Sequence, residues 1–199
     1  MKRLFAIAIT ALILTTSVNA VSYNSDPKIF ITELVGDAIK ILSDKKITKE
    51  EKSQQIEKIA IENVDINALG MYTLGDIRKT LDVETLNTYK KLFEKYFLKS
   101  LTSRLTDYSE KTFEVLSSVQ KSETTTIVSS RIAKSSSQPE IKIDWRVYTK
   151  DPSKPLIRDL IVEGLSLAKT QKEEFSSILN SNNNDINILF TKLEEFIKN

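Results

Sequence analysis

Three carboxylates in the C-terminal half of the chain are the side chains best suited to chemistry. Asp144, Asp159 and Glu163 lie close together in sequence, and carboxylates that share a site can act as general acid and base. Arg146 and Arg158 are near enough in strand order to pair with them across a sheet. Polar faces of strands usually carry such residues without catalysis. The pattern therefore favours ion pairs over an active site, although carboxylate-based catalysis stays open.

Other catalytic side chains are missing from the sequence. The chain contains no His and no Cys, which excludes Ser-His-Asp and Cys-His nucleophile systems and zinc sites with His or Cys ligands. Gly36, Gly70, Gly75 and Gly164 are isolated, so the sequence has no glycine-rich loop that could hold a phosphate. We therefore predict a protein that is not an enzyme and that has no cofactor and no metal site.

The N-terminus predicts an export signal. Lys2 and Arg3 precede an apolar run over residues 4–14, and small residues follow up to Ala20, as in a secretory signal peptide. The apolar run is too short to span a bilayer, which takes about 20 residues. No Cys follows the signal to carry a lipid anchor, so we expect the mature chain to be free in the periplasm. We predict a signal peptide over residues 1–20, cleavage after Ala20, and a single domain over residues 21–199.

Cleavage of this signal would also remove the net charge. The full chain has 29 Lys and Arg residues and 27 Asp and Glu residues. Lys2 and Arg3 are the only charged residues in the signal, so 27 residues of each sign remain. A neutral chain lacks the basic surface of a nucleic-acid-binding protein and should not adhere to anionic lipid surfaces.

The N-terminal half predicts helices. An Asp, Ser or Thr that directly precedes a segment with apolar residues repeating every 3.6 positions indicates a helix N-cap, and a Glu three residues later indicates a capping box. We expect helices that begin at Asp26–Pro27, at the capping box Thr48–Glu51, at Asp65 and, for the longest one, at Asp82; the helix from Asp65 ends near Gly70, and an irregular segment over 72–78 turns at Gly75.

The C-terminal half predicts a sheet followed by two helices. Runs rich in Thr, Val and Ile, separated by turn-prone segments, are typical of consecutive antiparallel strands. The sequence thus predicts an α+β fold in which a four-stranded antiparallel sheet packs against several helices around an apolar cavity. We expect strands over 111–119, 124–133, 140–149 and 156–167, with Ile141, Ile143, Trp145 and Val147 on one face of the third, and helices after the capping box Thr170–Glu173 and after Asp185.

The longest predicted helix carries a broad apolar stripe that has two interpretations. The whole stripe packs on the sheet as an ordinary core, or part of it faces a ligand cavity between helix and sheet. Such a cavity would suit an acyl chain, because each buried CH₂ contributes about 0.8 kcal/mol without any polar contact. The stripe consists of Leu86, Tyr89, Phe93, Tyr96, Phe97, Leu101, Leu105 and Tyr108.

The segment from Asp159 to Leu167, followed by Gln171, Phe175 and the pair Ile178–Leu179, resembles a stretch typical of the MlaC family, also known as the toluene-tolerance auxiliary-component family. The family pattern is a strand that ends in Glu-Gly-hydrophobic-Ser-hydrophobic and leads into a helix. In a separate segment, residues 72–78, the chain departs from the family and has Leu74 and Ile77 where an aromatic residue is expected. Further matches, in the right order, are Asp26–Pro27, the segment 65–75, Arg104–Leu105 with Tyr108, and Asp144–Val147.

This resemblance implies a non-catalytic periplasmic carrier whose cargo is a phospholipid. Members shuttle glycerophospholipid between an outer-membrane lipoprotein–porin complex and an inner-membrane ABC transporter with an MCE-domain ring, which maintains outer-membrane lipid asymmetry. We expect a monomer. Two alternatives remain: an enzyme on a cone-shaped α+β scaffold that acts on a lipid-like or steroid-like substrate through Asp159 or Glu163, and a periplasmic adaptor or chaperone whose groove binds protein.

From the resemblance we expect apolar residues of the long helix and of the sheet to line the lipid cavity. Leu165 is the strongest single candidate, since it lies within the sharpest part of the family pattern. We expect Gly164 to form a strand bulge that opens room for an acyl chain. The other predicted wall residues are Phe93, Phe97, Leu101, Ile143, Trp145, Val147, Ile161 and Leu167.

Overall fold

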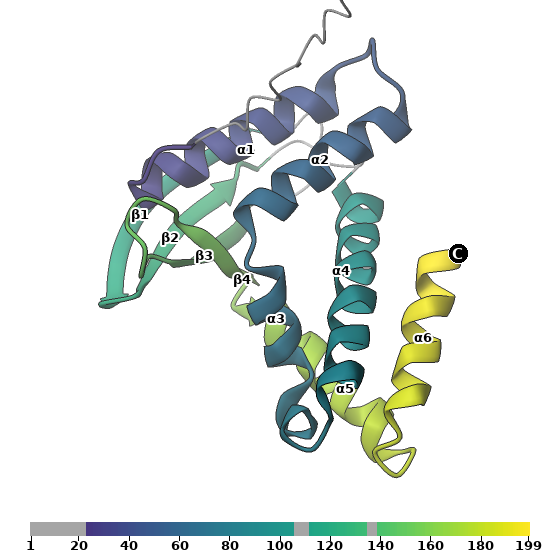
Figure 1. The fold of residues 1–199 in the computed structure, drawn as a ribbon. Helices are drawn as coiled ribbons and strands as arrows, with labels where there is room; N and C mark the ends of the chain where they lie inside the picture. Colours follow the sequence, from purple (N-terminus) through teal and green to yellow (C-terminus); the bar gives the residue numbers. More distant parts are fainter. Residues whose placement is uncertain (1–22, 106–111, 135–138) are drawn as a thin grey trace, which may run out of the picture.

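The computed structural model describes residues 23–105, 112–134 and 139–199. The chain forms helices, then an antiparallel sheet, then two more helices (Figure 1), which confirms the predicted α+β class and element order. The predicted signal peptide, Tyr108 and the predicted start of the first strand lie outside the described residues. Within those three ranges, no helix is both long and apolar enough to cross a membrane.

The predicted helix starts in the N-terminal half are confirmed by their side-chain hydrogen bonds. Asp26 accepts from two amides of the first turn, the Thr48–Glu51 capping box is complete, and Asp82 accepts from the Thr85 amide at 2.7 Å. Gly75 turns the chain with φ at +65°. The helices are α1 (Pro27–Ser43), α2 (Lys49–Asn63), α3 (Ile66–Thr73), the short 3₁₀ helix η1 (Gly75–Lys79) and α4 (Val83–Leu105).

The sheet has five strands rather than four, because the predicted fourth strand is divided. Glu163 and Gly164 both have positive φ, at 49° and 81°, which is the backbone of a two-residue hairpin turn. Gly164 is therefore a turn residue, and the prediction of a bulge at this position was wrong. The strands are β1 (Phe113–Ser122), β2 (Thr125–Ile132), β3 (Ile141–Tyr148), β4 (Leu156–Val162) and β5 (Leu165–Ser166), and they lie in this order across the sheet.

Helix α5 (Leu167–Asn180) begins earlier than predicted. Its N-cap is Ser166, whose hydroxyl accepts from the Lys169 amide at 3.0 Å. The proposed capping residue Thr170 lies inside the helix, and its hydroxyl donates to the Ser166 carbonyl. The capping-box prediction at Thr170 was wrong because the hairpin turn brings a competing cap four residues earlier. The last helix, α6 (Ile186–Lys198), is capped by Asp185 as predicted.

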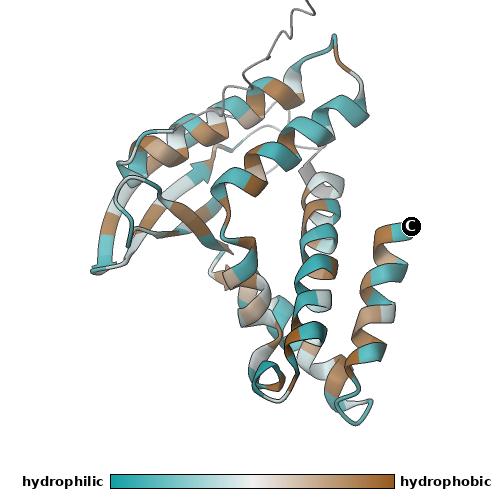
Figure 2. Ribbon diagram, viewed as in Figure 1, coloured by the Kyte–Doolittle hydropathy of each residue, from teal (hydrophilic) through white to brown (hydrophobic). Residues whose placement is uncertain are grey.

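The apolar residues form two separate clusters. The helical cluster joins α3, α4, α5 and α6 around buried residues that include Tyr89, Phe93 and Leu189, and Figure 2 shows apolar residues on the sides where α4 and α6 meet. The sheet cluster joins α1 to the sheet around Phe30, Val128 and others. Val64, just after α2, packs against both clusters. The fold thus has two cores that adjoin at the end of α2.

Gly70 allows α3 to approach α4 closely. A Cβ atom at this position would lie 2.7 Å from Cδ1 of Phe93, far inside normal contact distance. We expect Gly70→Ala to lower the free energy of unfolding by about 1–2 kcal/mol through overpacking, measured by urea denaturation. Gly36→Ala in α1 is the matched control, because its Cβ would meet nothing within 4 Å. It should raise stability by about 0.5–1 kcal/mol through helix propensity; equal effects at both sites would contradict the close approach.

Tyr89 is fully buried in the helical cluster, and its hydroxyl hydrogen-bonds with Thr73 Oγ1 (3.0 Å) and the Gly70 carbonyl (3.2 Å). Burial raises the pKa of Tyr89 above its usual range. A raised pKa in the folded state gives stability that is complete below the unfolded pKa of about 10 and is lost as the pH rises beyond it.

We therefore expect the Tyr89→Phe variant to be about 1 kcal/mol less stable than the wild type at pH 7, owing to the lost hydrogen bonds. This difference should shrink by about 1.4 kcal/mol per pH unit above pH 10. Urea denaturation of both proteins between pH 7 and pH 11 measures it. A difference that does not change with pH would show that Tyr89 is not desolvated in the folded state.

Candidate functional site

The strand pairing defines which residues share a face of the sheet. Residues directly opposite one another on paired antiparallel strands lie on the same face. Val128 pairs with Trp145, and Thr126 pairs with Val147. We call this side, which α1 covers through Phe30 and its neighbours, the inner face. The prediction that Ile141, Ile143, Trp145 and Val147 share a face is confirmed by their partners on β2.

Toward β4 and β5 the inner face is only partly covered. Val128 and Val147 are fully buried beneath α1, whereas Ile143 and Trp145 on β3 are half-buried. The row across the strands continues from Ile143 to its β4 partner Val162 and then to Leu165 on β5. Leu160, the partner of Trp145, is also half-buried. We call Ile143, Trp145, Leu160 and Val162 the inner-face row.

Trp145 presents an apolar surface although it carries a polar atom. Its indole N–H donates to the Ser130 hydroxyl at 2.8 Å, and that hydroxyl donates to the Ile143 carbonyl at 2.9 Å. The ring stands edge-on to Phe113 with the centroids 6.1 Å apart. Because the indole N–H is satisfied within the sheet, the rest of the ring is available for apolar contacts.

The predicted wall residues of α4 have different environments. Phe93 is 2% exposed and lies among Tyr89, Tyr96 and Phe175, so it is placed as a residue of the helical core. Phe97 and Leu101 are half-buried and pack against the edge of the helical cluster. Their contact with a ligand remains a prediction, as it does for Phe93.

The structure does not bring all predicted wall residues of the sheet together. Ile161 pairs with Asp144 and therefore lies on the outer face, opposite to Ile143. Leu167 starts α5 and is 42% exposed. The inner-face positions on β4 are Leu160 and Val162 instead, which the sequence reasoning missed. The sequence shows that both residues are aliphatic, but which residues of β4 face inward depends on the register of β4 against β3.

A β-bulge in β4 sets which of its residues face inward. Val147 pairs with Ile157 and Arg146 pairs with Asp159, so Arg158 is an extra residue. The bulge lets the consecutive residues Arg158 and Asp159 both point to the outer face, where the Arg158 guanidinium lies 3.3 Å above the ring centroid of Tyr148.

Each of these two residues holds a helix terminus. The Arg158 guanidinium donates twice to Asp65 Oδ2, at 2.7 and 2.9 Å, and Asp65 is the N-cap of α3. Asp159, which is 7% exposed, accepts from the Ala168 amide at 3.0 Å and from the Ser166 hydroxyl at 2.7 Å, both at the start of α5. Together they tie α3 and α5 to β4.

The candidate carboxylates do not form a catalytic cluster. Asp159 accepts the hydrogen bonds above and has Arg146 Nε at 3.7 Å, which confirms this ion pair. Glu163 accepts from the Lys142 backbone amide. Arg158 pairs with Asp65 and not with the sheet carboxylates, so that part of the prediction was wrong. In the described ranges no three His, Cys, Asp or Glu side chains are grouped as metal ligands.

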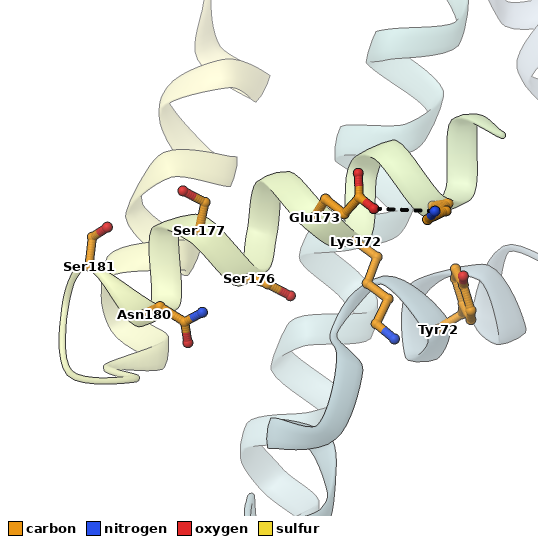
Figure 3. A pocket seen from close by; sticks show the side chains of 8 residues that line it. Tyr72, Lys172, Glu173, Ser176, Ser177, Asn180 and Ser181 are labelled. Atoms are coloured by element: carbon orange, nitrogen blue, oxygen red, sulfur yellow. Dashed lines mark ion pairs between the residues drawn. The ribbon is translucent and has the colours of Figure 1, made fainter. Parts of the chain in front are cut away.

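A hollow of about 500 Å³ lies against α5 and the end of α3 (Figure 3). Lys172 lies across it with its ammonium 5.2 Å from the Tyr72 ring centroid, and Lys169 pairs with Glu173 at 3.7 Å. The lining consists of charged groups, hydroxyls and an amide apart from Tyr72. This lining does not suit an acyl chain, and none of the predicted wall residues belongs to it.

Fold and site together define a protein with two apolar cores and a partly uncovered apolar sheet face, without a cluster of catalytic groups in the described residues. A family model described as MlaC protein matches residues 32–195. The chain belongs to the MlaC family, whose members are lipid carriers and not enzymes; this agrees with the predicted absence of catalysis.

A solved structure supports the same fold. The phospholipid-binding protein from Ralstonia solanacearum, solved in complex with a phospholipid, aligns with a TM-score of 0.72 at 16% sequence identity. The alignment covers 88% of this chain and 97% of that protein. No curated protein matches the chain.

The buried Asp159 should matter more for stability than the other sheet carboxylates. We expect Asp159→Ala to lower the free energy of unfolding by about 2–4 kcal/mol, because the Ala168 amide and the Ser166 hydroxyl lose their acceptor and the Arg146 guanidinium loses its ion-pair partner. Asp159→Asn keeps an acceptor oxygen and should cost less.

Urea denaturation monitored by circular dichroism measures both effects. Asp144→Ala is the control, since Asp144 has no ion pair within the described ranges, and a change within about 0.5 kcal/mol is expected. Equal losses for Asp159→Ala and Asp144→Ala would contradict the role of Asp159 in holding α5.

Proposed function

We propose that this chain is a periplasmic carrier that binds a phospholipid with its acyl chains against the inner-face row. The observation that carries the proposal is the half-buried state of Ile143, Trp145, Leu160 and Val162 in a member of a lipid-carrier family. A Val, Leu or Ile side chain that becomes fully buried contributes about 1.5–3 kcal/mol. An apolar ligand that binds to this row would therefore bury the part of these side chains that the folded protein leaves exposed.

The position of the row supports this reading. Its member Trp145 packs against the sheet cluster, as does Val64, where the helical and the sheet clusters adjoin, and Phe97 and Leu101 are half-buried against the helical cluster. Acyl chains between the two clusters would contact the sheet on one side and α4 on the other. The Ralstonia protein, which has this fold, was solved with a phospholipid bound.

The family membership extends the proposal to partners and location. The carrier exchanges glycerophospholipid with an outer-membrane lipoprotein–porin complex and with an inner-membrane ABC transporter that carries an MCE-domain ring. The signal peptide over residues 1–20 is removed after Ala20, and the neutral mature chain acts as a monomer in maintaining outer-membrane lipid asymmetry. An intact mass that corresponds to a chain beginning at Val21 would support the cleavage.

Native mass spectrometry of the protein purified from the periplasm tests the carrier function. We expect one phospholipid per chain in the wild type. Ile143→Glu places a charge against acyl chains, and Ile143→Trp fills their space, so both should lower lipid occupancy at least about ten-fold. Ile143→Trp adds no charge and keeps the test valid if Ile143→Glu fails to fold.

The matched control is Leu116→Glu, because Leu116 is 50% exposed on β1 at the opposite edge of the sheet. It should keep its lipid. Wild-type protein without phospholipid would contradict the carrier. Turnover of an added lipid by such protein would favour the enzyme alternative through Asp159 or Glu163, and co-purified polypeptide would favour an adaptor or chaperone.

A further inference from the structure

The inner-face row ends at an exposed leucine. Ile143 pairs with Val162, and Val162 pairs with Leu165, so the three side chains are neighbours on one face of three adjacent strands. Exposure rises along this line: Ile143 and Val162 are half-buried, and Leu165 is 68% exposed. The apolar surface therefore runs without interruption from the interior to the solvent at β5.

The side chain of Leu165 contributes little to the packing of the fold. It follows the hairpin turn at Glu163–Gly164, and a Cβ atom on Gly164 would meet nothing within 4 Å. The turn is exposed, and Leu165 stands beside it in a strand of two residues. A single exposed leucine is common on protein surfaces and contributes little to stability; Leu165 is set apart by its pairing with Val162 at the end of the apolar line that runs to Ile143.

We propose that Leu165 is the entry lip of the lipid site, the first apolar side chain that an acyl chain meets and the last that it leaves. This inference rests on the proposed function. A chain that enters along the row would exchange water for Leu165, then Val162, then Ile143. Leu165 then stabilises the half-entered acyl chain more than the fully bound one.

A lip and a wall have different kinetic signatures. A residue that stabilises only the half-entered state changes the association and dissociation rates by the same factor and leaves the equilibrium constant unchanged. A residue that lines the site changes the equilibrium constant. Glu163, next to the lip, is held by the Lys142 amide, so a second carboxylate at position 165 would add charge at the point of entry.

The experiment uses Trp145, the only tryptophan of the chain, as the reporter. Energy transfer from Trp145 to a phosphatidylethanolamine with a pyrene-labelled acyl chain, supplied in phosphatidylglycerol vesicles without any partner protein, gives both rate constants by stopped flow. We expect Leu165→Glu to lower association and dissociation rates about ten-fold each, with unchanged affinity and melting temperature. Leu165→Met should keep wild-type rates, and the exposed Leu116→Glu control should change neither rate.

Unchanged rates in Leu165→Glu would overturn the lip and leave the carrier function standing. Reduced affinity at an unchanged association rate would also overturn it and would make Leu165 a wall residue. Normal partner-free rates together with loss of transfer to a membrane complex would overturn it in favour of a protein-docking residue. A wild-type protein that binds no labelled lipid would contradict the carrier itself.

Discussion

The β-bulge at Arg158 is the constraint on which the arrangement of this protein depends. By placing Arg158 and Asp159 on the same face, it gives one strand two charged groups that each hold a helix start, at Asp65 and at Ala168. Hydrogen bonds to charged groups are worth more than neutral ones and fix direction as well as distance. The helical cluster is therefore attached to β4 through directional polar contacts and does not have to spread its apolar surface over the sheet. Without the extra residue, only one of the two helices could be held in this way.

This attachment explains why folding does not bury all of the apolar surface of the sheet. A sheet normally buries its apolar face beneath the helices that pack on it. Here α1 covers the part around Val128 and Val147, while α3 and α5 are held along β4. The remaining inner-face row stays half-covered, and among the described residues Val64 is the one that packs against both clusters. A carrier needs such a partly exposed apolar surface, since apolar side chains that are already buried in the core would gain no further burial from an acyl chain.

Sequence patterns predicted the caps that form within a helix's own first turn and failed where a preceding turn or the strand register decides. The N-caps Asp82 and Asp185 were found because each bonds to an amide within its own first turn. The α5 start was misplaced because Ser166 becomes a cap only after the preceding turn has formed. Ile161, predicted beside Ile143 in the cavity wall, lies on the other face of the sheet because the register of β4 against β3 contains a bulge that no period of two reveals. The alternation along β3 was predicted correctly, since that strand pairs with β2 without a shift.

The hydrogen bond from Trp145 to Ser130 has a consequence for selectivity. The indole N–H of Trp145 already donates to a hydroxyl within the sheet. The other side chains of the row are aliphatic, so the side chains of the row offer no further hydrogen bond to a ligand that lies on them. Dispersion and desolvation depend on volume and area and hardly at all on the position of a double bond or a branch. If this surface holds acyl chains, as proposed, it would tolerate a mixture of chain lengths and degrees of unsaturation.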